Sequence, residues 1–237
     1  MNSIEQSTIL VVDDDRDIVR AITIFLENEG YHVLTAYDGV AALEIVNTQP
    51  VHLLLLDVMM PKLDGLSLTM RIREKKNIPI IILSAKSEDT DKILGLSMGA
   101  DDYITKPFNP MELLARVKSQ LRRYINLGDV NMPQGDQVLT CGGLTFDKES
   151  RQLTVNGEEV KLTATESKII ELLMSSPGRI FPAEEIYERV WNEPSYSCEN
   201  TVMVHIRRIR EKIEINPKEP EYLKVVWGVG YKIEKKQ

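Results

Sequence analysis

Short apolar runs alternate with amphipathic segments through the first half of the chain. The runs are rich in Val, Ile and Leu with few polar interruptions, which is typical of strands buried on both faces of a parallel sheet. The segments between them have the periodicity of covering helices. The predicted strands are Ile9–Val12, His32–Ala36, Leu53–Leu56, Ile80–Leu83 and Tyr103–Thr105. Residues 1–123 are therefore predicted to form an α/β domain, a doubly wound sheet of five parallel strands.

The pattern changes after residues 124–137, a stretch with Gly and Pro that we interpret as a linker. Beyond it, residues 138–237 combine short strands with three helical periodicities. The predicted strands are Leu144–Phe146, Gln152–Val155, Val160–Leu162, Leu223–Val226 and Tyr231–Ile233, and the predicted helices are Thr165–Ser175, Ala183–Trp191 and Thr201–Ile213. A sheet, three helices and a terminal hairpin resemble an α+β winged helix-turn-helix domain.

Composition fits a folded protein of two modest domains. Of the 237 residues, 43% are hydrophobic and 27% charged, which excludes a disordered chain. The net charge is −7, divided as −4 before residue 124 and −3 after it, so any nucleic-acid contact needs a local basic patch. Cys141 and Cys198 are too few for a disulfide framework or a zinc site. No signal-peptide core or membrane-spanning stretch is evident, so we expect a soluble, cytoplasmic protein without a membrane partner.

Acidic residues follow two of the predicted strands at the edge where open parallel sheets bind ligands. Asp13 and Asp14 follow the first strand and Asp57 ends the third, so adjacent strands would bring three carboxylates together. Like charges this close destabilise one another unless a cation lies among them, and Mg²⁺ prefers such oxygen ligands. Ser84 after the fourth strand and Lys106 after the fifth add a hydroxyl and an ammonium. Together these residues predict a phosphoryl-transfer site.

Each residue alone also has a structural interpretation. Aspartates after a strand often cap the next helix, as Asp15 would here, and a single serine is commonly a cap. A Lys-Pro pair is commonly a turn. The coincidence at four strand ends is what favours function.

These strand ends resemble the receiver domain of bacterial two-component response regulators over nearly all of residues 8–123. The matching motifs are Val-Val-Asp13-Asp14, Asp57-Val-Met-Met-Pro61-Lys-Leu-Asp-Gly65, Ser84-Ala85 and Tyr103-Ile-Thr-Lys106-Pro107-Phe108. The resemblance implies a flavodoxin-like sheet with the strand order 2-1-3-4-5.

The same resemblance implies that Asp57 accepts a phosphoryl group from the phosphohistidine of a sensor histidine kinase. Ser84 and Lys106 would contact the phosphoryl oxygens, and Tyr103 would rotate inward when Ser84 moves, which turns a change of charge into a change of surface. The implied Mg²⁺ ligands are the side chains of Asp13, Asp14 and Asp57 and the backbone carbonyl of Met59.

A face with charges of both signs is predicted on the fourth and fifth helical segments and the fifth strand. Its residues are Lys92, Asp101, Asp102, Glu112, Arg116 and Arg123. A solvated surface is one interpretation, since an exposed ion pair contributes only about 0–1 kcal/mol. Mixed charge also suits a two-fold contact. The resemblance implies that this face forms a homodimer in the phosphorylated protein, with pairs such as Lys92–Glu112 and Asp102–Arg116 between subunits.

Positive charge is concentrated on the predicted helix at residues 201–213, which has four Lys or Arg against one Glu. Its apolar stripe consists of Val202, Ile206, Ile209 and Ile213. The candidate DNA contacts on the rest of this helix are Thr201, His205, Arg207, Arg208, Arg210 and Lys212. Such a helix fits a DNA major groove, although an ordinary surface helix with solvated arginines has the same pattern.

Residues 138–237 resemble the effector domain of OmpR/PhoB-type transcription regulators. The matching motifs are Leu162-Thr163-Ala-Thr-Glu166, Pro177-Gly178-Arg179, Val-His205-Ile-Arg207-Arg208-Ile-Arg210 and Val226-Trp227-Gly228-Val-Gly230-Tyr231. The resemblance implies a recognition helix at 201–213, a wing at 226–231 that reaches the minor groove, and a loop at 191–199 that faces RNA polymerase. The wing is also similar to that of vancomycin-resistance regulators.

Three residues, Asn200, Met203 and Trp227, depart from the family pattern, so base preference does not carry over. Trp227 stands where arginine is common, and it would either stack on a sugar or pack into the hairpin.

The sequence therefore predicts a transcription regulator, not an enzyme, in which phosphorylation of Asp57 favours dimerisation on double-stranded DNA. Half-sites about 10–11 base pairs apart fit two winged domains, and the resemblance implies direct repeats. A hydrolase is one alternative, but no water-activating base is evident. A flavodoxin-like redox protein would need aromatic loops, and aromatics total only 6%. A constitutive DNA binder is the third alternative, and the complete acidic site argues against it.

Overall fold

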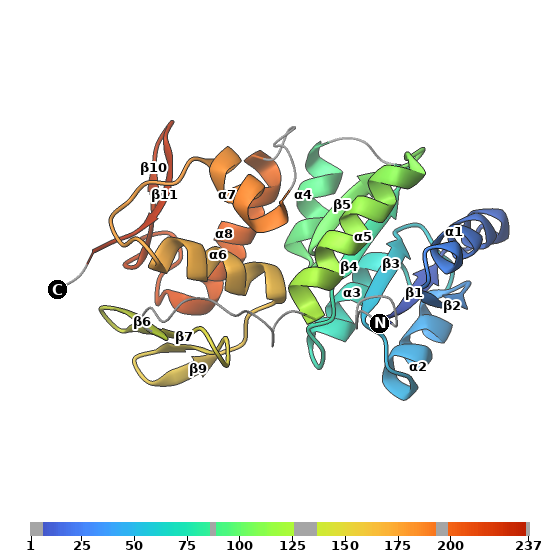
Figure 1. The fold of residues 1–237 in the computed structure, drawn as a ribbon, viewed down its shortest axis with the longest axis horizontal. Coiled ribbons are helices and arrows are strands. Elements are labelled where there is room, and N and C mark those ends of the chain that lie inside the picture. The colour runs from blue at the N-terminus through green and yellow to red at the C-terminus, as the bar shows by residue number, and fades with distance from the viewer. Residues whose placement is uncertain (1–6, 86–88, 126–136, 193–198, 236–237) are drawn as a thin grey trace. The chain divides into compact units, whose positions relative to one another are not determined.

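The computed structural model describes residues 7–85, 89–125, 137–192 and 199–235. These divide into two compact units, residues 1–125 and 126–237, each with its own hydrophobic core (Figure 1). Residues 126–136 of the predicted linker and 193–198 of the predicted polymerase-facing loop lie outside the described residues.

The first unit alternates strands and helices along the chain. Its elements are β1 (Thr8–Val12), α1 (Arg16–Asn28), β2 (His32–Ala36), α2 (Gly39–Thr48), β3 (Leu53–Asp57), α3 (Gly65–Arg73), β4 (Ile80–Ser84), α4 (Asp89–Ser97), β5 (Asp102–Thr105) and α5 (Pro110–Ile125). All strand pairs are parallel, in the order β2-β1-β3-β4-β5. This confirms the predicted fold class and strand order.

Helices cover both faces of the sheet, which explains the continuous apolar runs. On one face, Leu55 of β3 shares a core with Val19 of α1 and Val117 of α5. On the other, α2, α3 and α4 pack on the strands, and Gly95 of α4 lies directly against Ile82 of β4. Every residue of β1, β3 and β4 is consequently buried.

Aspartate caps make the helices begin close after the strands. The Asp15 side chain accepts hydrogen bonds from the backbone of Asp17 and Ile18 at the start of α1. Asp38 and Asp64 cap α2 and α3 in the same way. The cap at Asp15 turns the chain immediately after β1, so the two residues between strand and cap stay at the sheet edge.

The second unit begins with an antiparallel meander and ends with a hairpin (Figure 1). Its elements are β6 (Val138–Cys141), β7 (Leu144–Asp147), β8 (Leu153–Val155), β9 (Glu158–Val160), α6 (Ala164–Met174), α7 (Ala183–Trp191), α8 (Glu199–Ile213), β10 (Leu223–Val226) and β11 (Gly230–Ile233). The three helices and the final hairpin match the predicted winged-helix pattern. Phe146, Leu173, Trp191, Ile209 and Leu223 are among the residues of its core.

One strand of the meander was predicted two residues too late, and another was not predicted. The strand predicted at Val160–Leu162 is β9, Glu158–Val160, which begins directly after a two-residue turn formed by Asn156 and Gly157, both at positive φ. Val155 therefore pairs directly with Glu158. The strand β6 was not predicted, because it is largely exposed and gives no apolar run.

One contact between the final hairpin and the rest of the unit lies beside a glycine. Phe181, just before α7, exchanges two backbone hydrogen bonds with Tyr231 of β11, at 2.8 and 2.9 Å. Gly230 lies against this contact, and a Cβ there would sit 2.1 Å from the Phe181 carbonyl oxygen. Only glycine fits the anchor without displacing backbone.

We expect Gly230→Ala to destabilise the second unit by roughly 3 kcal/mol, because the new Cβ pushes Phe181 and the hairpin apart. Gly228 in the same hairpin has φ +71° and nothing within 4 Å of an added Cβ, so Gly228→Ala should cost only roughly 1 kcal/mol in backbone strain. Urea unfolding of the full chain followed by circular dichroism measures both. Equal losses for the two variants would contradict the anchor.

Candidate functional site

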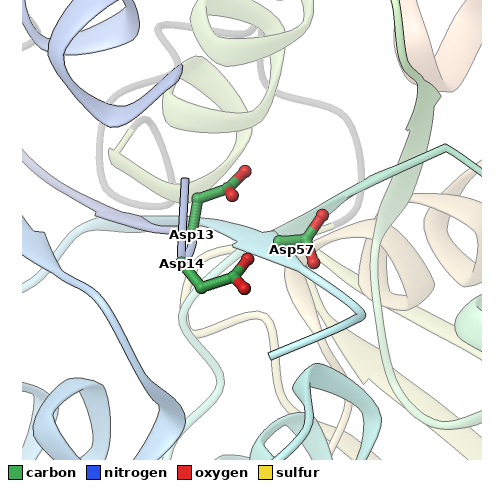
Figure 2. A group of neighbouring side chains, drawn as sticks. All are labelled: Asp13, Asp14 and Asp57. Carbon is green, nitrogen blue, oxygen red and sulfur yellow. The ribbon is translucent and has the colours of Figure 1, made fainter. Parts of the chain in front are cut away.

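Three carboxylates converge at the carboxyl ends of β1 and β3 (Figure 2). One oxygen from each of Asp13, Asp14 and Asp57 lies within 4.8 Å of the other two. The two strands are adjacent, with Val12 opposite Leu56, so the next residue of each meets at the same edge. Asp13 and Asp57 are buried, whereas Asp14 is exposed. The cluster is therefore walled on one side and open to solvent on the other.

The Lys106 side chain joins two of these carboxylates. Its Nζ donates to Oδ2 of Asp13 at 2.5 Å and to Oδ1 of Asp57 at 2.6 Å. The Lys106 backbone N–H donates to the Ser84 carbonyl at 2.7 Å, which fixes the end of β5 against β4. The other Asp57 oxygen accepts from the Met59 backbone N–H at 2.5 Å. Four strand ends thus contribute to one charged cluster.

Charge in this cluster is incompletely balanced. Burial raises the pKa of Asp57 above its ordinary value and the charge of Asp13 adds to the rise, while the hydrogen bond and charge of Lys106 offset only part of it. Burial alone would lower the pKa of Lys106, but its two carboxylate partners outweigh that effect and raise it. The cluster therefore contains three carboxylates and the one ammonium of Lys106, which contacts two of them. A divalent cation with oxygen ligands would supply the missing positive charge.

The backbone around Asp57 is closely packed against α3. The Gly65 N–H donates to the Val58 carbonyl at 3.0 Å. A Cβ on Gly65 would lie 2.1 Å from the Asp57 carbonyl oxygen. The glycine that ends the Asp57 motif therefore lets the start of α3 hold the acidic loop in place.

The two predicted switch residues lie on β4 and β5. Ser84 is buried at the end of β4, opposite Thr105. Tyr103 is 9% exposed, and a Cβ at Gly95 of α4 would come within 3.2 Å of its ring. The ring therefore packs against α4.

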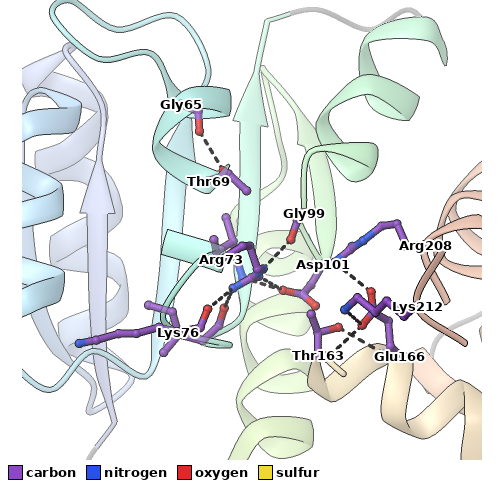
Figure 3. Close-up of polar contacts among 12 residues, drawn as sticks. Gly65, Thr69, Arg73, Lys76, Gly99, Asp101, Thr163, Glu166, Arg208 and Lys212 are labelled. Atoms are coloured by element: carbon purple, nitrogen blue, oxygen red, sulfur yellow. Dashed lines mark hydrogen bonds and ion pairs between the residues drawn. The ribbon is translucent and has the colours of Figure 1, made fainter. Parts of the chain in front are cut away.

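The predicted dimer face has partners within the chain. Arg116 contacts both carboxylate oxygens of Asp102 at 3.1 Å and Glu112 at 3.1 Å. Asp101 turns inward, where its Oδ2 accepts from Arg73 at 2.6 Å and from the Ile80 backbone at 3.0 Å (Figure 3). This corrects the expectation that Asp101 belongs to an open charged face. Lys92 on α4 is half-buried.

The apolar stripe of α8 packs in the core of the second unit as predicted. The predicted outward row of cations needs correction, because several of them have partners inside the unit. Arg208 and Lys212 both pair with Glu166, at 3.0 and 2.6 Å. Arg210 donates to the Leu223 carbonyl at 2.9 Å, and the His205 ring lies 5.4 Å from that of Trp191.

Two of the predicted DNA contacts are fully open. The Arg207 side chain is 71% exposed and pairs with Glu211 at 3.0 Å. Trp227 is 88% exposed at the tip of the β10–β11 hairpin, so it does not pack into the hairpin. Thr201 lies in the first turn of α8.

Sequence reasoning missed the role of Glu166 as a partner of α8. The pattern Thr163-x-x-Glu166 marks a capping box, which the structure contains. The capping-box pattern places Glu166 at the start of α6. It does not indicate that Glu166 pairs with Arg208 and Lys212, which lie more than forty positions further along the chain.

An acidic cluster with a bound lysine on a 2-1-3-4-5 sheet, followed by a winged-helix unit, defines a regulator with separate receiver and effector modules. Residues 9–118 match the family model described as response regulator receiver domain. Residues 157–233 match the model described as transcriptional regulatory protein, C terminal.

Whole-length relatives identify the family. The chain is 45% identical to regulatory protein VanRc of Enterococcus gallinarum over 227 residues, 96% of this chain and 98% of that protein. It is 42% identical to VanR of Enterococcus faecium over 228 residues, again 96% and 98%. The crystal structure of the response regulator DrrB, a Thermotoga maritima OmpR/PhoB homologue, matches with TM-score 0.50 and 33% identity over 97% of this chain and 99% of that one. The chain belongs to the OmpR/PhoB-type response regulators, which are transcription regulators.

Among the described residues, no helix has the length and hydropathy needed to cross a membrane.

We expect Asp57→Asn to stabilise the first unit at pH 7 when no divalent cation is present. The pKa of Asp57 is raised in the folded state, so folding favours the protonated carboxyl. The unmodified chain therefore has its full stability below the ordinary Asp pKa, about 4, and loses part of it as the pH rises through the folded pKa. The advantage of the variant should therefore vanish near pH 3. Urea unfolding at both pH values measures it.

Asp64→Asn is the matched control. The hydrogen bond from the Ser67 backbone lowers the pKa of Asp64, so its ionised form is favoured by folding. This variant should lose a little stability at pH 7. A stabilisation as large as that of Asp57→Asn would contradict the electrostatic explanation.

Proposed function

We propose that phosphorylation of Asp57 by the phosphohistidine of a sensor histidine kinase switches this transcription regulator. The supporting observation is the Lys106 ammonium between Asp13 and Asp57, beside the exposed Asp14. In the proposed step an Asp57 oxygen attacks phosphorus, the O–P bond forms as the N–P bond breaks, and imidazole leaves with the electron pair. Lys106 is already within hydrogen-bond distance of the attacking carboxylate.

Mg²⁺ is the proposed cofactor, held by the side chains of Asp13, Asp14 and Asp57 and by the Met59 carbonyl. The donor set fits, since three carboxylates gather within 4.8 Å and one of them faces solvent. When bound, the ion supplies charge that offsets repulsion between the carboxylate and the incoming phosphoryl group. Lys106 and Ser84 are proposed to contact the phosphoryl oxygens once they are in place.

The second unit is proposed to bind double-stranded DNA, with α8 in the major groove and the β10–β11 hairpin as a minor-groove wing. Exposed Arg207 and Trp227 support this arrangement. The further proposed contacts are Thr201, Arg210 and Lys212, whereas His205 and Arg208 are buried inside the unit. Trp227 would lie against deoxyribose, because an indole offers apolar surface where an arginine would offer charge.

Phosphorylation is proposed to favour a homodimer in the cytoplasm on direct-repeat promoter sites, with the loop at 191–199 facing RNA polymerase. The charges of Lys92, Asp102, Glu112 and Arg116 are of both signs, which suits a two-fold contact. Two linked winged units bind more tightly than one through effective concentration.

A constitutive DNA binder is the second candidate, because the Tyr103 ring is buried against α4. Measuring DNA affinity with and without the phosphate mimic beryllofluoride separates the two. The switch predicts tighter binding with the mimic, and identical affinities favour the constitutive binder.

Asp57→Asn should abolish labelling of the full chain by radiolabelled acetyl phosphate with Mg²⁺, because the amide cannot attack phosphorus. Asp64→Asn changes an exposed carboxylate at the other end of the same loop, and this variant should be labelled like the unmodified chain. Retained label on the Asp57 variant would remove this residue as the acceptor. Omitting Mg²⁺ should suppress labelling of the unmodified chain.

Arg207→Ala should weaken binding to a DNA fragment identified by genome-wide footprinting, by roughly 1–3 kcal/mol if it contacts guanine in bidentate fashion. Trp227→Ala should weaken binding without changing its salt dependence, because an apolar contact releases no counterions. Ile215→Ala is the control, since this side chain is 97% exposed and follows α8. Affinities equal to the control would place Arg207 and Trp227 outside the interface.

A further inference from the structure

Glu214, the residue that follows α8, binds the backbone at the start of β10. Its side chain is buried and accepts hydrogen bonds from three consecutive backbone N–H groups. The Glu221 N–H lies 2.6 Å from Oε2, and the N–H groups of Tyr222 and Leu223 lie 2.9 and 2.8 Å from Oε1. Hydrogen bonds from backbone N–H groups to a carboxylate are roughly twice as strong as those between neutral groups. The end of α8 is therefore fixed to the start of β10.

The same strand has a second polar contact with α8. Arg210, one helical turn before Glu214, donates from Nε to the Leu223 carbonyl at 2.9 Å. Leu223 also packs in the core of the unit, but apolar packing is not directional, whereas hydrogen bonds are. The connection from α8 to β10, residues 215–221, lies largely at the surface, and Ile215 is 97% exposed. The side chains of Arg210 and Glu214 therefore orient β10 relative to α8.

This orientation matters most at the tip of the hairpin. The β10–β11 hairpin projects from the body of the second unit (Figure 1). Trp227 follows β10 and lies four residues beyond Leu223, about 13 Å along an extended strand. A small tilt at the base of the hairpin therefore moves the exposed indole by a larger distance.

We propose that Glu214 is a positioning residue for DNA recognition: it holds the hairpin at a fixed position relative to α8, so that Trp227 and Arg207 contact DNA at the same time. This inference rests on the proposed binding of DNA by the second unit. Two contacts on one rigid frame reinforce each other, because forming the first places the second without further loss of freedom. A hairpin that could tilt would lose that freedom on binding, and its contact would contribute less affinity.

Glu214→Gln is the direct test. Glutamine has nearly the same size, but its NH₂ group is a donor, so the backbone N–H groups that face one of the two oxygens lose their acceptor. The measurement is a double-mutant cycle on the affinity of the full chain for a footprinted DNA site. The affinity loss caused by Trp227→Ala should be about fivefold smaller in the Glu214→Gln background than in the unmodified chain. The loss caused by Arg207→Ala should be equal in both backgrounds, because Arg207 lies on α8 itself.

This pattern separates positioning from a general loss of structure, which would reduce the effects of both alanine substitutions alike. Equal losses from Trp227→Ala in the two backgrounds would overturn the proposal, and so would equal reductions for Trp227→Ala and Arg207→Ala. If neither alanine substitution weakens binding by the unmodified chain, the proposed function of the second unit fails instead.

Glu219→Gln is the matched control. Glu219 is exposed in the same connection, and its side chain accepts from Asn216 at 3.3 Å. This variant removes an equal charge from the segment that joins α8 to β10. In its background, Trp227→Ala should cause the full loss of affinity. A loss as small as in the Glu214→Gln background would assign the effect to charge alone and overturn the proposal.

Hydrogen exchange tests the contact in the unmodified chain, in case Glu214→Gln does not fold. The backbone N–H groups of Tyr222 and Leu223 should exchange slowly, because both point to the buried carboxylate. The Lys218 N–H, which donates to the exposed Asn216 side chain at 3.2 Å, should exchange fast. Equal rates at all three positions would show that Glu214 does not hold β10, and would overturn the proposal.

Discussion

The ion pairs of Lys106 with Asp13 and Asp57 are the interaction on which the arrangement of the acidic cluster depends. They join the ends of β1, β3 and β5, and β4 separates β3 from β5 in the sheet. A single ammonium cannot balance the charge of three carboxylates, so the cluster stays negative even with these ion pairs formed. A site with surplus charge responds strongly to a cation or a phosphoryl group, and the same surplus lowers its stability without them.

The second unit has the reverse arrangement. There one buried carboxylate lies between two cations, and its three partners tie α8 to the start of α6. In both units, a charged side chain pairs with two charged groups from distant segments of the chain. Local structure brings the backbone into place, through the cap at Asp15 and the close approach of Gly65 to Asp57.

Most of the fold was predictable because its strands are buried on both faces and therefore apolar throughout. The meeting of Asp13, Asp14 and Asp57 followed from a general property of parallel sheets. Prediction was wrong where this pattern is lost, as in the exposed β6 and after the turn at Asn156.

The environment of Arg208 was beyond sequence reasoning for another reason. Helical periodicity places this residue away from the apolar stripe, but the pairing with Glu166 depends on how two helices pack. The same holds for Asp101, whose partner Arg73 comes from α3.

The bidentate contact between Arg116 and Asp102 within one chain bears on the energetics of self-association. A dimer that used this pair between subunits would have to break it inside each subunit first. Each Arg116–Asp102 pair lost within a subunit would be replaced by one between subunits, so the number of ion pairs would not change. These pairs would then contribute little net affinity, but they would still select the orientation of the partner. Association strength would then have to come from the apolar contacts around the pair.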